Sequence, residues 1–132
     1  MAKETGITST ISVDDSGGVL RDISNDVLSF SVGTPQGLID ATGLDKSAME
    51  RLIGLSDGTV SLTMAFNGAA GASSFDVFKT RIGTRTFTWA QSGQTLTMEM
   101  LVGTVNYSRG QDGGLQLTAD LSLQSGTVPT WA

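Results

Sequence analysis

The chain is 132 residues long, carries a formal net charge of −5, and contains neither cysteine nor histidine. Without those residue types it cannot form disulfides, Cys or His metal sites, or Ser-His-Asp and Cys-His triads. The negative charge argues against nucleic-acid binding, which requires clustered Lys and Arg. Only 16% of the residues are charged, which is low for a freely soluble monomer and indicates that other copies cover part of the surface. We expect no cofactor and no metal.

The length predicts a single domain over residues 1–132. Apolar stretches are short and interrupted by Thr, Ser and Gly, so the sequence predicts no membrane span. The first six residues, Met1 to Gly6, lack the apolar segment of a signal peptide, so we expect an intracellular product.

The N-terminal third predicts three short strands. They cover Gly6 to Val13, Val19 to Ile23 and Leu28 to Val32, and the first two are joined by a turn over Asp14 to Gly18. Alternation places one set of side chains toward a core. This set is Ile7, Ile11, Val13, Leu28, Phe30 and Val32.

A long excursion follows from Gln36 to Gly58. Leu38 to Gly43 predicts extended chain, whereas Asp45 to Ile53 predicts one or two turns of helix, capped by Asp45 and ended by Gly54. Long excursions in compact domains are usually functional or interfacial, so we expect this one to contact other subunits. The candidate inter-subunit residues are Leu38, Ile39, Leu44, Met49, Leu52, Ile53 and Leu55.

The middle of the chain predicts a strand, a helix and another strand. Val60 to Phe66 alternates, Ser73 or Ser74 can cap a short helix, and Thr84 to Gln91 alternates again. The tail from Gly126 to Ala132 predicts extended chain. The apolar positions of the helix and second strand are Phe75, Phe78, Ile82, Phe87 and Trp89.

The clearest pattern is a long β-hairpin over Gln94 to Ser125, with its turn at Arg109 to Gly114. The apolar parity of the first strand flips near Gly103, which predicts a β-bulge there. We expect Val105 opposite Leu117 and Tyr107 opposite Leu115, which brings Met100 against Leu121 and Met98 against Leu123.

The opposite face of this hairpin is polar, mildly acidic and free of Lys and Arg. Such a face stays wet and repels phosphates. The residues of this face are Thr95, Thr97, Glu99, Gln116, Thr118, Asp120, Ser122 and Gln124.

Three weaker patterns suggest other chemistry. Asp15-Ser16-Gly17 has the form of an aspartic-protease motif and would imply a homodimeric enzyme, but the flanking residues favour a hairpin turn. Asp14, Asp15 and Asp22 lack the ligand spacing of an EF-hand, and residues 68–74 lack the lysine of a P-loop. Two further residues, Trp89 and Trp131, predict core or interface fillers, because no basic cluster accompanies them.

Several stretches together resemble the major tail tube proteins of long-tailed bacteriophages. They are Val13 to Gly18 followed by Arg21 to Ser24, then Leu38 to Gly43, then Glu50 to Gly58 leading into a strand. This resemblance covers most of the chain in order, and the order and spacing carry it. It implies a mainly antiparallel β-sandwich or partial barrel with one short flanking α-helix and a long partly helical loop.

The resemblance also implies a structural virion protein and not an enzyme. Such proteins form hexameric rings that stack into a tail tube, through which DNA passes without specific binding. The eight residues on the polar face of the hairpin are then the candidate channel-lining residues. The implied partners are other copies of the chain, a tape-measure protein and other tail proteins, with no membrane. The implied locations are the virion tail and, during assembly, the host cytoplasm. A secretion-system tube protein of related fold is the remaining alternative.

Overall fold

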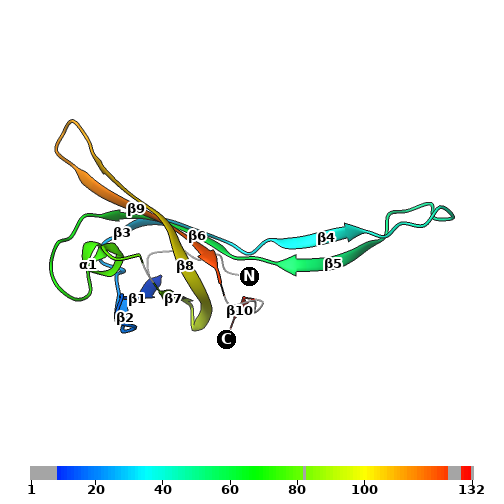
Figure 1. Ribbon diagram of the computed structural model, residues 1–132, viewed down its shortest axis with the longest axis horizontal. Helices are drawn as coiled ribbons and strands as arrows, with labels where there is room; N and C mark the ends of the chain where they lie inside the picture. Colours follow the sequence, from blue (N-terminus) through cyan, green and yellow to red (C-terminus); the bar gives the residue numbers. More distant parts are fainter. Residues whose placement is uncertain (1–8, 82, 125–128, 132) are drawn as a thin grey trace.

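The computed structural model describes residues 9–81, 83–124 and 129–131. Its elements in chain order are β1 (Thr10–Asp14), β2 (Leu20–Asp22), β3 (Val27–Gly33), β4 (Gln36–Asp40), β5 (Arg51–Ser56), β6 (Thr59–Ala65), α1 (Ser74–Phe78), β7 (Thr84–Gln91), β8 (Gln94–Arg109), β9 (Leu115–Leu123) and β10 (Thr130–Trp131). Figure 1 shows a body that contains most strands and the helix, and an arm formed by β4 and β5 that projects from one end.

The body is built on one antiparallel sheet in the order β2-β1-β7-β8-β9-β6-β3, with β10 pairing with β8 beyond the end of β9. The sheet curls over, because Phe30 on the edge strand β3 meets Trp89 on β7 with ring centroids 5.1 Å apart. The predicted fold class is therefore confirmed as mainly antiparallel β with one short helix.

The core lies inside this curl and follows from the period of two along each strand. Along β6, along β8 from Leu96 to Val102, and along β9 from Leu117 to Leu121, every second residue is apolar and buried. The short helix closes one side of the core with Val77 and Phe78, and Ser73 caps its N-terminus. The largest buried apolar side chains include Ile11, Leu62, Met64, Phe87, Leu96, Met100, Leu117 and Leu121.

The bulge at Gly103 is confirmed, since the pairing of β8 with β9 shifts between Val102 and Thr104. The predicted register was wrong by two residues. Tyr107 lies opposite Leu117, not Leu115. Alternation fixes which face a side chain takes, but the turn fixes the register, and this turn is shorter than expected. The same shift places Val105 opposite Ala119, Val102 opposite Leu121 and Met100 opposite Leu123.

The helix predicted over Asp45 to Ile53 was wrong, because this stretch forms a turn and the start of β5. The Thr42 side chain accepts a hydrogen bond from the Glu50 N–H at 2.9 Å and donates one to the Glu50 carbonyl at 3.2 Å. These bonds close the loop. A helix of one or two turns pays the nucleation cost without packing, whereas pairing with β4 satisfies the backbone of β5.

The third predicted strand contains one further error. Leu28 was expected in the core, but it is 58% exposed because β3 bulges between Val27 and Ser29. Other expectations lie outside the described residues. These are Ile7, Ile82 and the tail residues 126–128 and 132.

Candidate assembly surfaces

The polar face of the hairpin lies where the alternation places it. All eight candidate channel-lining residues are exposed or half-buried, while their neighbours along β8 and β9 fill the core. Hydroxyl side chains of the adjacent strands continue this face. Strand pairing places Thr59, Ser61 and Thr63 beside β9, and Thr84, Thr86 and Thr88 beside β8. We call this surface the polar face.

The two carboxylates of the polar face are held by hydroxyls from neighbouring strands. Thr86 on β7 donates to Oε1 of Glu99 at 2.6 Å, and Ser61 on β6 donates to Oδ1 of Asp120 at 2.9 Å. The strand residues of this face, taken from the described part of the chain, include no Lys or Arg. Charge-assisted bonds of this kind fix the acidic groups close to the sheet.

Sequence reasoning missed two features of the polar face. It did not include the hydroxyls on β6 and β7, although their alternation with apolar residues was visible. It also missed Leu101, a large apolar side chain that is exposed on this face. Leu101 lies between Thr84 on β7 and Ser122 on β9. Leu101 lies just before the bulge, where the parity of β8 changes.

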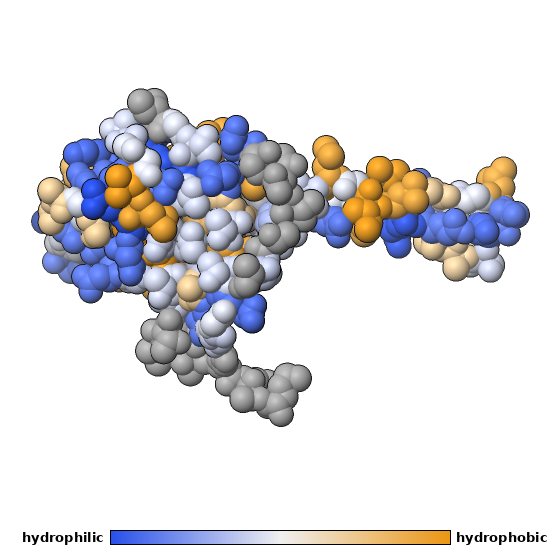
Figure 2. Space-filling view, turned by 90° about the horizontal axis from the view of Figure 1, so that it is seen from below, coloured by the Kyte–Doolittle hydropathy of each residue, from blue (hydrophilic) through white to orange (hydrophobic). Residues whose placement is uncertain are grey.

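The arm has the opposite character. Leu38 lies opposite Ile53, and the next pair, Ile39 and Leu52, points to the other face of the two-stranded ribbon. Among the strands that the structure describes, β4 and β5 pair only with each other. All seven candidate inter-subunit residues are exposed, and Figure 2 shows apolar side chains gathered along the arm.

The base and end of the arm are shaped by short contacts. Gly37 faces Gly54, and a Cβ added to Gly54 would lie 3.2 Å from the Gly37 carbonyl oxygen, so a small residue is needed there. At the far end, the Thr42 N–H and then its hydroxyl hold the pKa of Asp40 below its ordinary value. Lys46 pairs with Glu50 at 3.1 Å on the exposed turn. We call residues 41–50 the arm tip.

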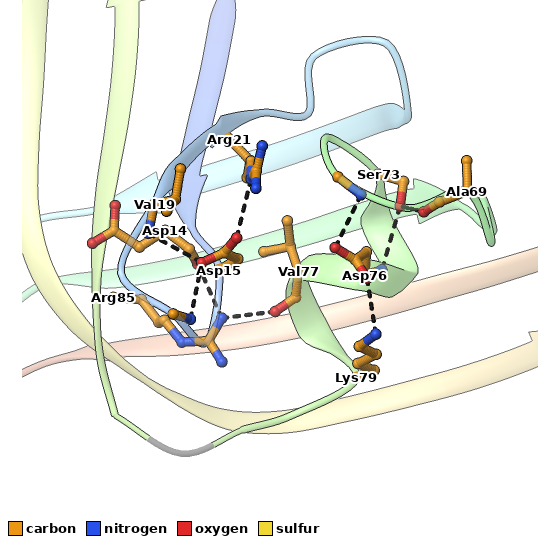
Figure 3. Close-up of polar contacts among 12 residues, drawn as sticks. Asp14, Asp15, Val19, Arg21, Ala69, Ser73, Asp76, Val77, Lys79 and Arg85 are labelled. Carbon is orange, nitrogen blue, oxygen red and sulfur yellow. Dashed lines mark hydrogen bonds and ion pairs between the residues drawn. The ribbon is translucent and has the colours of Figure 1, made fainter.

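Asp15, the residue of the protease alternative, lies in the turn between β1 and β2 (Figure 3). Its carboxylate accepts hydrogen bonds from the Gly17 and Val19 N–H groups and from Nε of Arg21, at 2.9 to 3.0 Å. The Val19 bond and then the Arg21 bond hold the pKa of Asp15 below its ordinary value. An acid dyad that shares a proton needs a raised pKa, so these contacts favour the turn.

Arg85 is a buried residue that the sequence did not single out. It lies on β7 on the same side as Phe87 and is 1% exposed. Its guanidinium donates to the carbonyls of Asp14, at 3.0 Å, and Val77, at 2.7 Å (Figure 3). It also donates to the carbonyl of Thr80. Burial lowers the pKa of Arg85, while Asp15 and Asp14 raise it. The side chain thereby ties the end of α1 to the end of β1.

A second buried polar cluster fixes the start of α1. Asp26, from the loop before β3, accepts hydrogen bonds from Nδ2 of Asn67 at 3.1 and 3.2 Å and from the Ser74 N–H at 2.9 Å. The loop over residues 68–74 is thus held as a connection into the helix, and within it the Ala69 N–H donates to Oδ1 of Asn67 and the Gly71 N–H donates to Oδ2 of Asp76. These bonds account for the burial of a carboxylate.

The part of the chain that the structure describes contains neither a cluster of side chains that could hold a metal ion nor a helix that could span a membrane. No group of three or more acidic side chains there is arranged to hold a metal ion, which covers Asp14, Asp15 and Asp22. The described helix is too short and too polar to span a membrane.

The fold can be compared with known proteins. No protein-family model and no curated protein matches the chain. Solved structures do match. A chain of the virion of a native gene transfer agent (GTA) particle is 12% identical, with a TM-score of 0.75 over 98% of this chain and 99% of that one.

Two further structures match equally well. The tail of an empty GTA particle, determined with helical refinement and C6 symmetry, gives a TM-score of 0.74 at 12% identity over 98% of this chain and 99% of that one. The SPP1 tail tube gives 0.74 at 9% identity over 98% of this chain and 78% of that one. The predicted resemblance is therefore confirmed at the level of the fold, and the chain has the fold seen in the SPP1 tail tube and in the GTA tail.

Proposed function

We propose that this chain is a structural virion protein that polymerises as stacked hexameric rings into a phage tail tube. The polar face then forms an acidic channel for passage of the genome into the host, with a tape-measure protein among the partners. The fold of tail proteins over 98% of the chain supports this proposal. So does the C6 symmetry of the GTA tail to which the chain is similar.

The observation that carries the proposal is the arm. A two-stranded ribbon is marginally stable in water, and one with exposed leucine and isoleucine on both faces exposes more apolar surface than a monomer normally does. Both faces need a partner. A copy of the same chain on each side supplies two partners at once, and a head-to-tail contact of that kind generates rings and filaments.

The polar face supports the channel. DNA carries a dense negative charge, so a wall whose only described ionic groups are Glu99 and Asp120 offers it no counter-charge. The hydroxyls and amides around them keep the wall hydrated. In the same ring, neighbouring subunits pair the edge strands β2 and β3, which a monomer leaves open.

Assembly is tested by negative-stain electron microscopy of the purified protein. We expect tubes built from six-fold rings, and a protein that stays monomeric at every concentration contradicts the proposal. The double variant Leu38→Ser and Ile53→Ser, which makes one arm face polar, should abolish the tubes. Leu101→Ser is the matched control, because it makes the same change at an exposed leucine of the body.

The channel is tested by a helical reconstruction of the tubes. We expect Glu99 and Asp120 to face the lumen, and a map that places them at a subunit contact or outside refutes this part. The double variant Glu99→Lys and Asp120→Lys should still form tubes but retain short DNA duplexes. Asp112→Lys, in the exposed turn between β8 and β9, should retain none.

A further inference from the structure

An aromatic cluster lies at the end of the body farthest from the arm. The rings of Phe66 and Phe75 are 5.0 Å apart, and Tyr107 lies 6.3 and 6.5 Å from them. Strand β6 separates the two ends, since the arm enters it at Thr59 and Phe66 follows its last residue. Figure 1 shows the turn between β8 and β9 projecting at this end, away from the arm.

The cluster is only partly covered by its own chain. Tyr107 is 50% exposed, and Leu115 beside it is also exposed. Their side chains lie on the core side of β8 and β9, near the buried Leu117, but β7 pairs with β8 only as far as Leu101 and so does not cover Tyr107. Exposed aromatic and leucine side chains gathered at one place mark a binding surface.

We infer that this cluster receives the arm tip of a copy in the adjacent ring, with Leu44 and Met49 packed against Phe66, Phe75 and Tyr107. The inference rests on the proposed function. It assigns a receptor surface to the arm and specifies which end of one ring meets which end of the next.

The geometry of stacking points to this end. Rings that stack by one repeated contact place one end of each subunit against the opposite end of the next. The arm occupies one end of the body, and the aromatic cluster occupies the other. With the arm projecting along the tube axis, the contact brings arm tip and cluster together in every step of the tube.

The chemistry of the two surfaces agrees. Leu44 is fully exposed and Met49 is half exposed, and a methionine sulfur packs favourably on aromatic rings. Arg109, at the end of β8 near the cluster, forms no ion pair with any described residue. The same holds for Asp45 on the arm tip, so the contact would bring together surfaces that carry opposite charges.

An apolar hollow elsewhere on the body is the alternative receptor for the arm tip. It has a volume of about 340 Å³ and is lined mainly by Trp89 and Trp131, with Gln91, Ser92 and Gln94. This hollow lies toward the arm end of the body, because Pro129, two residues before Trp131, lies near Gly58 and lines a hollow with Ser56 at the base of the arm. A contact between opposite ends does not bring the next arm to it.

The test uses the absence of cysteine from the chain. Ser47→Cys places a thiol on the arm tip, and Gly68→Cys places one beside the cluster, where an added Cβ would lie 3.6 Å from the ring of Phe66. Tubes of the double variant are treated with a short bismaleimide and analysed on denaturing gels. We expect an extended covalent ladder. Ser47→Cys alone should give dimers at most.

The competing site is tested in the same experiment by pairing Ser47→Cys with Gln94→Cys, which lies at the tryptophan hollow. A ladder from that pair and none from the Gly68 pair overturns the inference while leaving the tube intact. If the unsubstituted protein forms no tubes, the proposed function fails first and the inference fails with it.

A substitution provides a second readout. Tyr107→Ser removes the exposed ring of the cluster and should raise the protein concentration needed for tubes about tenfold. Asn106→Ser, the next residue on the other face of β8, is the matched control and should not change it. Circular dichroism checks that both variants fold. An unchanged threshold for folded Tyr107→Ser protein also overturns the inference.

Discussion

The body and the arm use the same types of residue in opposite ways. In the body, each strand turns apolar side chains to the core and polar ones to water, so Leu117 is completely buried and Gln116 beside it is exposed. In the arm, both faces of the ribbon carry exposed leucine or isoleucine. The proposed assembly accounts for this difference, because the body folds on its own contacts, whereas the arm would acquire its contacts from other subunits.

A matched pair of leucines gives the largest expected effect. Leu117→Ala leaves a cavity in the body and should lower the free energy of unfolding by about 2–5 kcal/mol. Leu55→Ala, at a residue that is 91% exposed on the arm, should change it by less than about 0.5 kcal/mol. Urea unfolding of the unassembled subunit measures both values. The order of the two effects should reverse in a tube-formation assay, where Leu55→Ala should lower the yield of tubes more than Leu117→Ala does, each measured against the parent.

A similar loss of unfolding free energy in both variants would contradict this distinction between body and arm. Such a result would mean that the arm packs on its own body in solution. Deuterium exchange provides an independent check, because amides of β4 and β5 should exchange quickly in the subunit and slowly in tubes.

A matched pair of arginines comes next. Arg85→Met removes a buried donor from the carbonyls of Asp14 and Val77 and should cost about 1–3 kcal/mol of unfolding free energy. Arg51→Met changes an exposed arginine on the arm and should be neutral in the subunit. Arg85→Lys restores one donor and should recover part of the loss. Equal stability of Arg85→Met and the parent would show that the buried guanidinium contributes nothing net.

The body was largely predictable because its signal is local. Alternation along β6, β7, β8 and β9 assigns the core face whatever the partner strands are, and the parity break at Gly103 reveals the bulge. Register was less predictable, because it depends on how tightly the turn after Arg109 closes. The position of Leu28 depends on a bulge that has no glycine to mark it.

The arm and Arg85 were not predictable for a different reason. Asp45 to Ile53 has helix-forming residues and a cap, so local preference favours helix, and only pairing with β4 across the turn decides otherwise. Alternation places Arg85 on the same side as Phe87, but a charged side chain favours a solvent-exposed position. Arg85 is buried because two distant carbonyls, of Asp14 and Val77, converge on it. The seven apolar residues of the excursion are exposed in the subunit, and their role as inter-subunit contacts stays a prediction.

The acid dependence of stability should distinguish two aspartates. Hydrogen bonds within the turn lower the pKa of Asp15 from an ordinary value of 3.8. Its contribution to stability is therefore complete above that value and is lost as the pH falls through the lower value of the folded state. Asp15→Asn should flatten this loss. Asp40 also has a lowered pKa, but Asp40→Asn should leave the acid limb of body unfolding unchanged. Urea midpoints measured across the acid range compare the two variants. If both variants changed the acid dependence of the midpoint, the arm and the body would unfold as one unit.

The smallest expected effect comes from a pair of glycines. A Cβ at Gly103 would lie 3.5 Å from the Asp120 carbonyl oxygen, which is ordinary contact, so Gly103→Ala should change the unfolding free energy by less than about 0.5 kcal/mol. A Cβ at Gly54 would lie 3.2 Å from the Gly37 oxygen and 3.3 Å from its carbonyl carbon, so the ribbon must shift. Gly54→Ala should also leave the unfolding of the subunit unchanged but lower the yield of tubes. Thermal unfolding and electron microscopy of the same samples separate the two effects, because a distorted arm matters only where another subunit must fit it.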